Sequence, residues 1–388
     1  MTTHHARPPV VRGPAEILAV LPYSLGFHPE RSLVLVGLAH GVLTTIQRID
    51  LVVTPTPGEA QAYVEHIWHM ADVAVRADAD AAVLVAYEDL AEESEPALNL
   101  LAQAVGGSGI DVLGMLWVRH GRWGRFDRDD PDCPSEGLPL LRPADVPTVA
   151  DFVALGVAPA ASRERLADRV TPTPGDRTTH AVGAAVHRRV ARRRPGDPSV
   201  PPRRVLATWR AFLTGCEESD GLTVVDPDRR DLTPAELASV AVSLLDVQWR
   251  DAVIGWLCPG TLPLDALPVD VRTAVRRLPR PAGAPAPVGR ATTRAVHGLE
   301  VCLHRLCAVL SDETGEVAAA VLTLAANVAW WRGDGAMAST CLERALDIDP
   351  GYRLADLLDR AVAAGVRPPV GDIDMAREEG WAASRTAG

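Results

Sequence analysis

The sequence predicts a mixed α/β domain with flanking helices, followed by a mainly α-helical C-terminal region. Up to about residue 140, short Leu- and Val-rich runs alternate with segments of helical period, which is typical of an α/β sheet. After residue 140 only the helical period continues, and a Pro/Ala-rich stretch interrupts it. We therefore expect a disordered tail at 1–13, an α/β domain at 14–140, a helical region at 141–278, a linker at 279–290 and a helical C-terminal region at 291–388.

The densest pattern in the chain runs from Ala15 to Leu38. Apolar residues at helical spacing after Pro14 predict a helix that Pro22 either ends or bends. Gly26 suits the left-handed conformation that closes a helix. The Leu/Val run that follows, Leu33–Leu38, predicts a strand buried on both faces.

The next segment, Val42–Val53, alternates well enough to pair with that strand through a turn at His40–Gly41, which would make the sheet mixed in direction. The α/β domain is completed by expected helices at 58–75 and 96–105, strands at 81–87 and 110–118, and a short strand ending near 126. Beyond it, helices are expected at 146–156, 162–170, 176–194, 204–214, 233–256 in two pieces, 269–278, 292–311, 314–331, 336–347 and 353–364.

Composition argues against several classes of protein. The chain has 388 residues and a net charge of -11, so we expect neither a general nucleic-acid binder nor a membrane-surface binder. No apolar run reaches the roughly 18 residues of a membrane span. All 39 basic residues are arginines. A pyridoxal phosphate cofactor and a P-loop nucleotide site both need a lysine, so both are argued against, and no other cofactor is evident.

The six cysteines are scattered and form no CxxC pair. The N-terminus carries no apolar secretory segment. We therefore expect reduced, mostly buried thiols and a cytoplasmic protein.

Several motifs together resemble an actinobacterial family catalogued as domain of unknown function 4192. They are LPYSLGFHPERSLVLVGL at 21–38, RIDL at 48–51, GRW at 121–123, DPDCPSEG at 130–137, AWWRGD at 329–334, ERAL at 343–346 and DPGY at 349–352. The resemblance implies an α/β N-terminal half, a helical remainder and no established activity. Relatives often carry paired cysteines in the 130–137 loop, where this chain has Cys133 alone, which argues against a zinc site.

Tyr23, Phe27 and His28 surround the Gly26 corner. They could form a small pocket in which His28 acts as acid, base or ligand. The favoured alternative is a structural corner, in which Gly26 supplies a positive φ, Pro29 stiffens the turn and the aromatic rings pack in the core.

Two carboxylates, Glu88 and Asp89, follow the predicted strand at 81–87, where ligands gather in open α/β sheets. Asp50 could join them if its strand runs in the same direction. Such a group could hold Mg²⁺ or act as acid and base. The favoured alternative is a solvated acidic helix start, because five carboxylates lie between Glu88 and Glu95.

Arg119, Arg122 and Arg125 flank Trp123 in the turn after the strand at 110–118. They could present guanidinium groups to a phosphate or carboxylate, with the indole stacking on the ligand. The favoured alternative is an exposed hairpin tip with Trp123 packed beneath it. The candidate ligand site therefore comprises Tyr23, His28, Asp50, Glu88, Asp89, Arg119, Arg122 and Trp123.

Two further clusters are weaker. His66 and His69 share one helix face, but no third ligand is evident, so no metal site is predicted. Seven arginines between Arg188 and Arg204 could grip nucleic acid. The acidic chain and the lack of interleaved aromatic residues argue against that role.

The segment Trp330–Tyr352 resembles one tetratricopeptide-like helical hairpin. One unit cannot form the groove of a repeat array, so we expect it to pack on the preceding helices or, if exposed, to dock a protein partner. Since no catalytic constellation is found, the leading hypothesis is a non-enzymatic interaction or regulatory protein whose partner docks on the C-terminal helices. The alternative is a binder of, or an enzyme acting on, a small phosphorylated or carboxylated ligand at the α/β domain. Nucleic-acid binding through Arg188–Arg204 is the third hypothesis.

Overall fold

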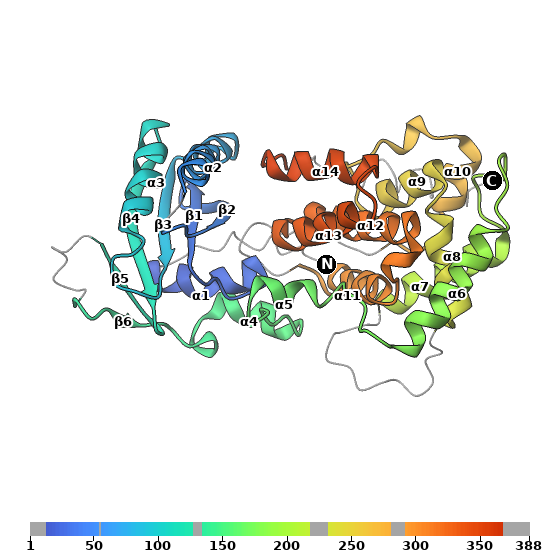
Figure 1. Cartoon of the computed structure of the whole chain (residues 1–388), viewed down its shortest axis with the longest axis horizontal. Helices are drawn as coiled ribbons and strands as arrows, with labels where there is room; N and C mark the ends of the chain where they lie inside the picture. The colour runs from blue at the N-terminus through green and yellow to red at the C-terminus, as the bar shows by residue number, and fades with distance from the viewer. Residues whose placement is uncertain (1–12, 54–55, 127–133, 218–231, 281–291, 368–388) are drawn as a thin grey trace, which may run out of the picture.

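The computed structural model describes residues 13–53, 56–126, 134–217, 232–280 and 292–367. Within them a mixed sheet with covering helices lies beside a mainly helical region, as the sequence predicts (Figure 1). The expected tail up to residue 12, most of the expected linker, Cys133 and everything after residue 367 lie outside the described residues.

The sheet has the strand order β2-β1-β3-β4-β5-β6. Strands β3 and β4 are parallel, and the other neighbouring pairs are antiparallel, which confirms the mixed sheet. β1 and β3 are buried on both faces, whereas β2 lies at the edge. The bounds are β1 (Ser32–Ala39), β2 (Val42–Asp50), β3 (Ala81–Tyr87), β4 (Asp111–Arg119), β5 (Arg122–Arg125) and β6 (Leu138–Pro139).

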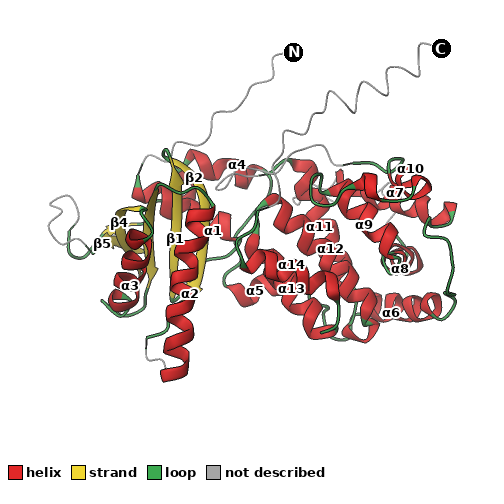
Figure 2. Cartoon of the chain, turned by 90° about the horizontal axis from the view of Figure 1, so that it is seen from above, coloured by secondary structure: helices red, strands yellow, loops and turns green. Residues whose placement is uncertain are grey.

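Helices cover both faces of the sheet (Figure 2). α2 (Pro57–Arg76) and α3 (Glu95–Gly107) pack on the face that carries Leu33 and Leu35 of β1. α1 (Pro14–Leu25) packs on the opposite face. It continues through Pro22, so the proline does not end it, and Gly26 with φ +77° closes it in the expected left-handed conformation.

The rest of the described chain is mainly helical, and α12 (Glu316–Arg332) is the central helix of its C-terminal part. α12 is apolar on every side and buried along nearly its whole length, because it contacts α8, α9, α11, α13 and α14. The other helices are α4 (Pro147–Ala154), α5 (Arg163–Ala167), α6 (Arg177–Val190), α7 (Arg203–Glu217), α8 (Pro234–Ser243), α9 (Val247–Leu257), α10 (Val269–Val275), α11 (Arg294–Ala308), α13 (Gly335–Ile348) and α14 (Arg353–Ala363).

The segment Trp330–Tyr352 comprises the end of α12, all of α13 and the turn before α14, and α13 packs on both α12 and α14. The likeness of this segment to a tetratricopeptide unit stays a prediction. The chain after α14 then returns to the α/β domain. The Arg76 guanidinium donates to the Ala364 carbonyl over 2.8 Å, and a His69 ring nitrogen lies 2.5 Å from the Ala363 carbonyl. On the other side, the Trp330 indole donates to the Val366 carbonyl over 2.8 Å. Residues 363–366 therefore tie α2 to α12.

Two other predictions bear on the class of protein. No helix in the described ranges is long and apolar enough to cross a bilayer. The five cysteines in these ranges are buried thiols, as expected.

Candidate functional site

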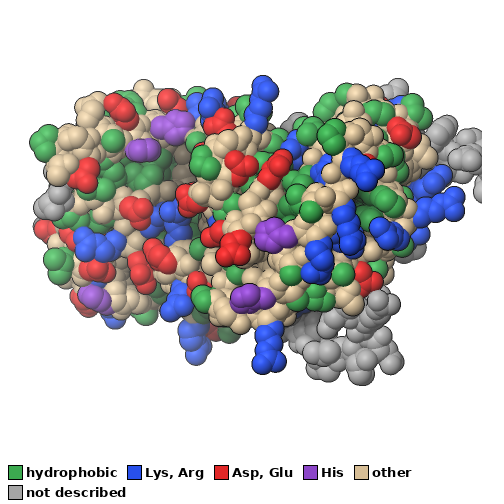
Figure 3. All heavy atoms as spheres, turned by 45° about the vertical axis from the view of Figure 1, so that its right-hand side comes forward, with side chains coloured by type: hydrophobic (Ala, Val, Ile, Leu, Met, Phe, Trp, Pro, Cys, Tyr) green, Lys and Arg blue, Asp and Glu red, His purple; other side chains and the backbone are tan. Residues whose placement is uncertain are grey.

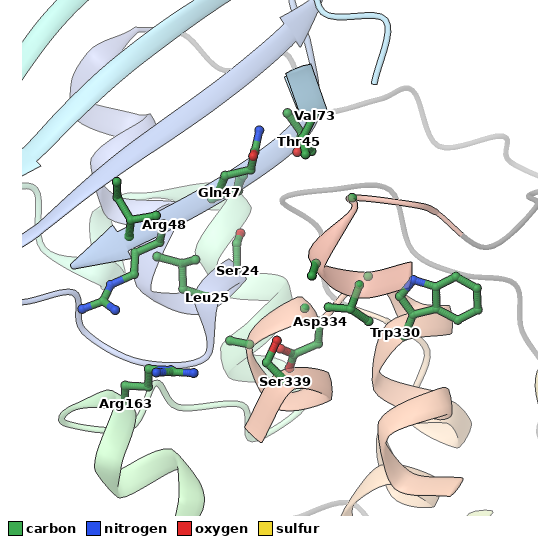
Figure 4. A pocket seen from close by; sticks show the side chains of 18 of the residues that line it. Ser24, Leu25, Thr45, Gln47, Arg48, Val73, Arg163, Trp330, Asp334 and Ser339 are labelled. Carbon is green, nitrogen blue, oxygen red and sulfur yellow. The ribbon is translucent and has the colours of Figure 1, made fainter. Parts of the chain in front are cut away.

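A cavity of about 850 Å³ lies between the edge strand β2 and the turn that joins α12 to α13 (Figure 4). Its walls come from distant parts of the chain. One wall is the end of α1 with the Phe27 corner, a second is β2, a third is the segment Trp330–Ser339, and residues 362–367 close one side.

The Gly26 corner shapes the first wall. After Gly26 turns the chain, the Phe27 ring is buried and the His28 N–H donates to the Ala160 carbonyl over 2.9 Å. Tyr23 packs on the Phe152 ring with centroids 5.5 Å apart. Tyr23 and Phe27 are therefore packed against neighbouring elements, and both also line the cavity.

The opposite wall begins where Gly333, with φ +91°, ends α12. Asp334 then caps α13, because its Oδ1 accepts the Met337 N–H over 2.9 Å. Its Oδ2 accepts from Arg332 over 2.5 Å, and Arg332 also pairs with Glu300 of α11 over 2.8 Å. Gly26 lies next to this wall, since a Cβ there would meet Asp334 Oδ2 at 3.9 Å.

The carboxylate of Glu300 is buried among basic groups. Burial alone would raise its pKa, but Arg332, His297 and His304 outweigh it and hold the pKa of Glu300 at about 2. Burial lowers the pKa of His304 to about 4, despite the neighbouring Glu300. Glu300 is thus ionised and His304 neutral at pH 7. The ionised Glu300 forms a buried ion pair with Arg332 behind the cavity wall.

Arginines outnumber carboxylates among the cavity residues, with four (Arg48, Arg163, Arg332 and Arg367) against two (Asp50 and Asp334). Three of the four are ion-paired. Arg48 lies 2.6 Å from Asp50, Arg163 lies 2.5 Å from Glu343, and Arg332 lies between Glu300 and Asp334.

Arg367 is different, because no carboxylate in the described part of the chain pairs with it. Arg367 is exposed overall, but the protein around its guanidinium desolvates it and so lowers the pKa of Arg367. An anion that entered the cavity would relieve that desolvation cost, so Arg367 is the group best placed to recognise a negative charge.

Four of the residues proposed from sequence line one smaller hollow of about 240 Å³, at the carboxyl ends of β3 and β4. They are His28, Glu88, Asp89 and Arg119. Its ionic groups already satisfy one another. Arg119 lies 2.6 Å from Glu88 Oε1, and the Ser94 hydroxyl donates to Glu88 Oε2 over 2.7 Å. Glu88 is therefore a buried structural carboxylate that fixes the start of α3.

The other proposed residues lie elsewhere. The guanidinium of Arg122 donates to the carbonyls of Glu136 and Gly137 over 2.8 and 2.5 Å, and Trp123 is buried. Arg119 and Arg122 lie opposite each other on β4 and β5, but their guanidinium groups are already bound, to Glu88 and to the carbonyls of residues 136 and 137. Tyr23 and Asp50 line the large cavity. β2 does run parallel to β3, but β1 separates Asp50 from Glu88.

The two weaker clusters lie in different places, and His66 of the histidine pair lines the large cavity. His69 contacts the Ala363 carbonyl, and within the described residues no group of three or more His, Cys, Asp or Glu side chains could hold a metal. Arginines of the 188–204 segment are exposed at the end of α6 and the start of α7, and Arg189 lies in the field of Arg188, Arg192 and Arg204. Figure 3 shows how arginine side chains gather over the helical region. A nucleic-acid role for this surface stays a prediction.

Sequence reasoning missed Arg48, Trp330, Arg332, Asp334, Ser339 and Arg367 as cavity residues. A signal for some of them was present. The RIDL stretch at 48–51 and the AWWRGD stretch at 329–334, which carry the family resemblance, face each other across the cavity.

Comparisons with known proteins agree with that resemblance. No curated protein and no solved structure matches the chain. Residues 14–369, nearly the whole chain, match the family described as Domain of unknown function (DUF4192). The chain therefore belongs to this family.

Proposed function

We propose that this protein binds a small ligand bearing a carboxylate or phosphate in the cavity between β2 and the α12–α13 turn, and that it acts by binding and not by catalysis. The observation that carries the proposal is a cavity of about 850 Å³ lined by Arg367, whose guanidinium pairs with no carboxylate in the described part of the chain. A cavity of this size lies within the range of sites for small organic ligands, roughly 300–1,000 Å³.

The lining supports binding over catalysis. Its apolar part includes the rings of Tyr23, Phe27 and Phe152, which can cover the body of a ligand. Most of its charged groups are committed to ion pairs with each other, such as Arg48 with Asp50 and Arg332 with Asp334. Committed groups can orient a ligand, but they are poorly placed to exchange protons with it.

The location of the cavity supports a regulatory role. One wall belongs to the α/β domain and the other to the C-terminal helices, so a bound ligand would contact both and favour one arrangement of the two. We also propose that the protein acts in the cytoplasm, which the buried thiols of the five described cysteines support.

The test is a thermal-shift screen with nucleotides, sugar phosphates, dicarboxylates and acidic peptides. A ligand should raise the Tm as its concentration rises. Ser339→Phe, which adds a ring to the cavity wall, should remove the shift, whereas Ser135→Phe in an exposed loop should keep it. The proposal is wrong if no compound raises the Tm, or if the Tm of the Ser339→Phe variant responds to ligands like that of the unaltered protein.

A further inference from the structure

The cavity exposes the open edge of a sheet. Six successive residues of β2, Thr45–Asp50, line it. Neighbouring side chains on a strand point to opposite faces, so a cavity over one face would touch every second residue. Contact with all six means that the cavity lies along the edge of β2.

The surrounding residues agree with that geometry. Tyr63 and Val73 belong to α2 on one face of the sheet, whereas Leu25 and Phe27 belong to the α1 corner on the other. All four line the same cavity. The cavity therefore straddles the outer edge of β2.

The backbone of this edge is unsatisfied in the described residues. β2 pairs with β1 on one side, and in such a pair every second residue directs its N–H and C=O away from the partner strand. No hydrogen bond other than those to β1 reaches the backbone of Val42–Asp50 from the described chain. A row of free donors and acceptors is a template for another extended chain.

From these observations, and resting on the proposed function, we infer that the ligand is an extended peptide segment with acidic side chains, which adds to the sheet as a further strand beside β2. Backbone hydrogen bonds to the strand edge would hold the peptide, and the walls on the two faces would receive its alternating side chains. Arg367, which has no carboxylate partner among the described residues, would favour acidic residues over basic ones.

The recessed position of the edge explains why β2 can stay open. Exposed edges are liabilities, because other sheets can pair with them. Here the α12–α13 turn and residues 362–367 stand opposite β2. We expect these walls to admit a single peptide more readily than the edge of another sheet.

The test uses a capped heptapeptide of alternating valine and glutamate, with binding measured by isothermal titration calorimetry. Two versions carry backbone N-methyl groups on alternate residues, in the two possible phases. One phase blocks the N–H groups that face β2 and should weaken binding at least ~10-fold, and the other should bind like the parent peptide. Equal behaviour of the two phases would overturn strand addition.

Charge is tested separately with Arg367→Glu. This variant should bind the glutamate peptide ~10-fold more weakly and should bind a valine–lysine peptide more tightly than the unaltered protein does. Arg142→Glu, which makes the same charge change at an exposed position outside the cavity, should do neither. Equal effects of the two variants would overturn the assignment of Arg367.

The outcomes separate this inference from the proposed function. If phosphates or dicarboxylates shift the Tm but no peptide binds, the cavity is a small-anion site and strand addition is wrong. If no probe of either kind binds, both fail.

Discussion

Gly26 holds the corner that forms the first wall of the cavity, and its backbone has φ +77°. A Cβ would have room, since its nearest neighbour, Leu166 Cδ1, would lie 3.6 Å away. Gly26→Ala should therefore lower the free energy of unfolding by about 1–2 kcal/mol through backbone strain alone. Urea denaturation measures it. Gly58→Ala, at an ordinary φ in the first turn of α2 with open space around it, is the control and should not destabilise.

Glu88 tests whether the smaller hollow is structural. Glu88→Gln removes the partner of Arg119 and leaves a half-buried guanidinium uncompensated, so the free energy of unfolding should fall by about 2–4 kcal/mol. Asp89→Asn next to it breaks only an exposed pair with Arg31 at 3.8 Å and should change the free energy by less than ~0.5 kcal/mol. Similar effects of the two substitutions in urea denaturation would contradict the structural role.

At the scale of single residues, the sequence was informative where a local rule applied. The positive φ of Gly26 and the burial of Phe27 and Trp123 follow from turn and packing preferences. The partner of Arg119 was not predictable, because it depends on the parallel pairing of β3 with β4, which places both strand ends together. The bonds from Arg122 to two backbone carbonyls were also not predicted. No local sequence pattern marks a side chain that binds carbonyls 14 and 15 residues away.

Among the helices, the cluster on α11 and α12 should make stability depend on pH. The pKa of His304 is about 4 in the fold and about 6.5 when exposed, so the unfolded chain binds more protons between these values. The free energy of unfolding should therefore fall as pH drops from 6.5 to 4, by up to ~1.4 kcal/mol per pH unit. Glu300, with a pKa lowered from 4.5 to about 2, extends the loss below pH 4.5, and the raised pKa of Asp334 in the same cluster offsets part of it.

His304→Gln isolates the upper part of this pH dependence. The variant should lose the slope between pH 6.5 and 4 in urea denaturation while keeping the loss at lower pH. His40→Gln, which alters an exposed histidine paired with Asp80, should leave the whole profile unchanged. A wild-type slope in the His304 variant would contradict the assignment.

The contact between α2 and the end of the helical region is also testable. Arg76→Ala removes the bond to the Ala364 carbonyl, which is worth about 1 kcal/mol net at an exposed site. Amide hydrogen exchange of residues 363–367 should then become about fivefold faster. A loss of about 1 kcal/mol gives this factor, because ~1.4 kcal/mol corresponds to a factor of ~10. Arg142→Ala should leave that exchange unchanged. Unchanged exchange in Arg76→Ala would mean that other contacts hold the segment.

For the whole molecule, the sequence predicted the parts better than their assembly. β3 has the predicted bounds, Ala81–Tyr87, because an apolar run with clear limits and of this length is typical of a buried strand and short for a helix. The cavity could not be predicted, because it forms where β2 meets a turn nearly 300 residues later. That contact depends on how side chains of the α/β domain fit against those of the C-terminal helices, and no local pattern in the sequence predicts such a fit.

The position of the ligand between these two units is the central claim. The most direct measurement is photo-crosslinking with the best-binding compound or peptide from the screens, carrying a diazirine, followed by mass spectrometry of the linked residues. The account predicts crosslinks on both β2 (Val42–Asp50) and the segment Trp330–Ser339. Crosslinks confined to the hollow around His28 and Arg119, or scattered over the outer surface, would contradict it.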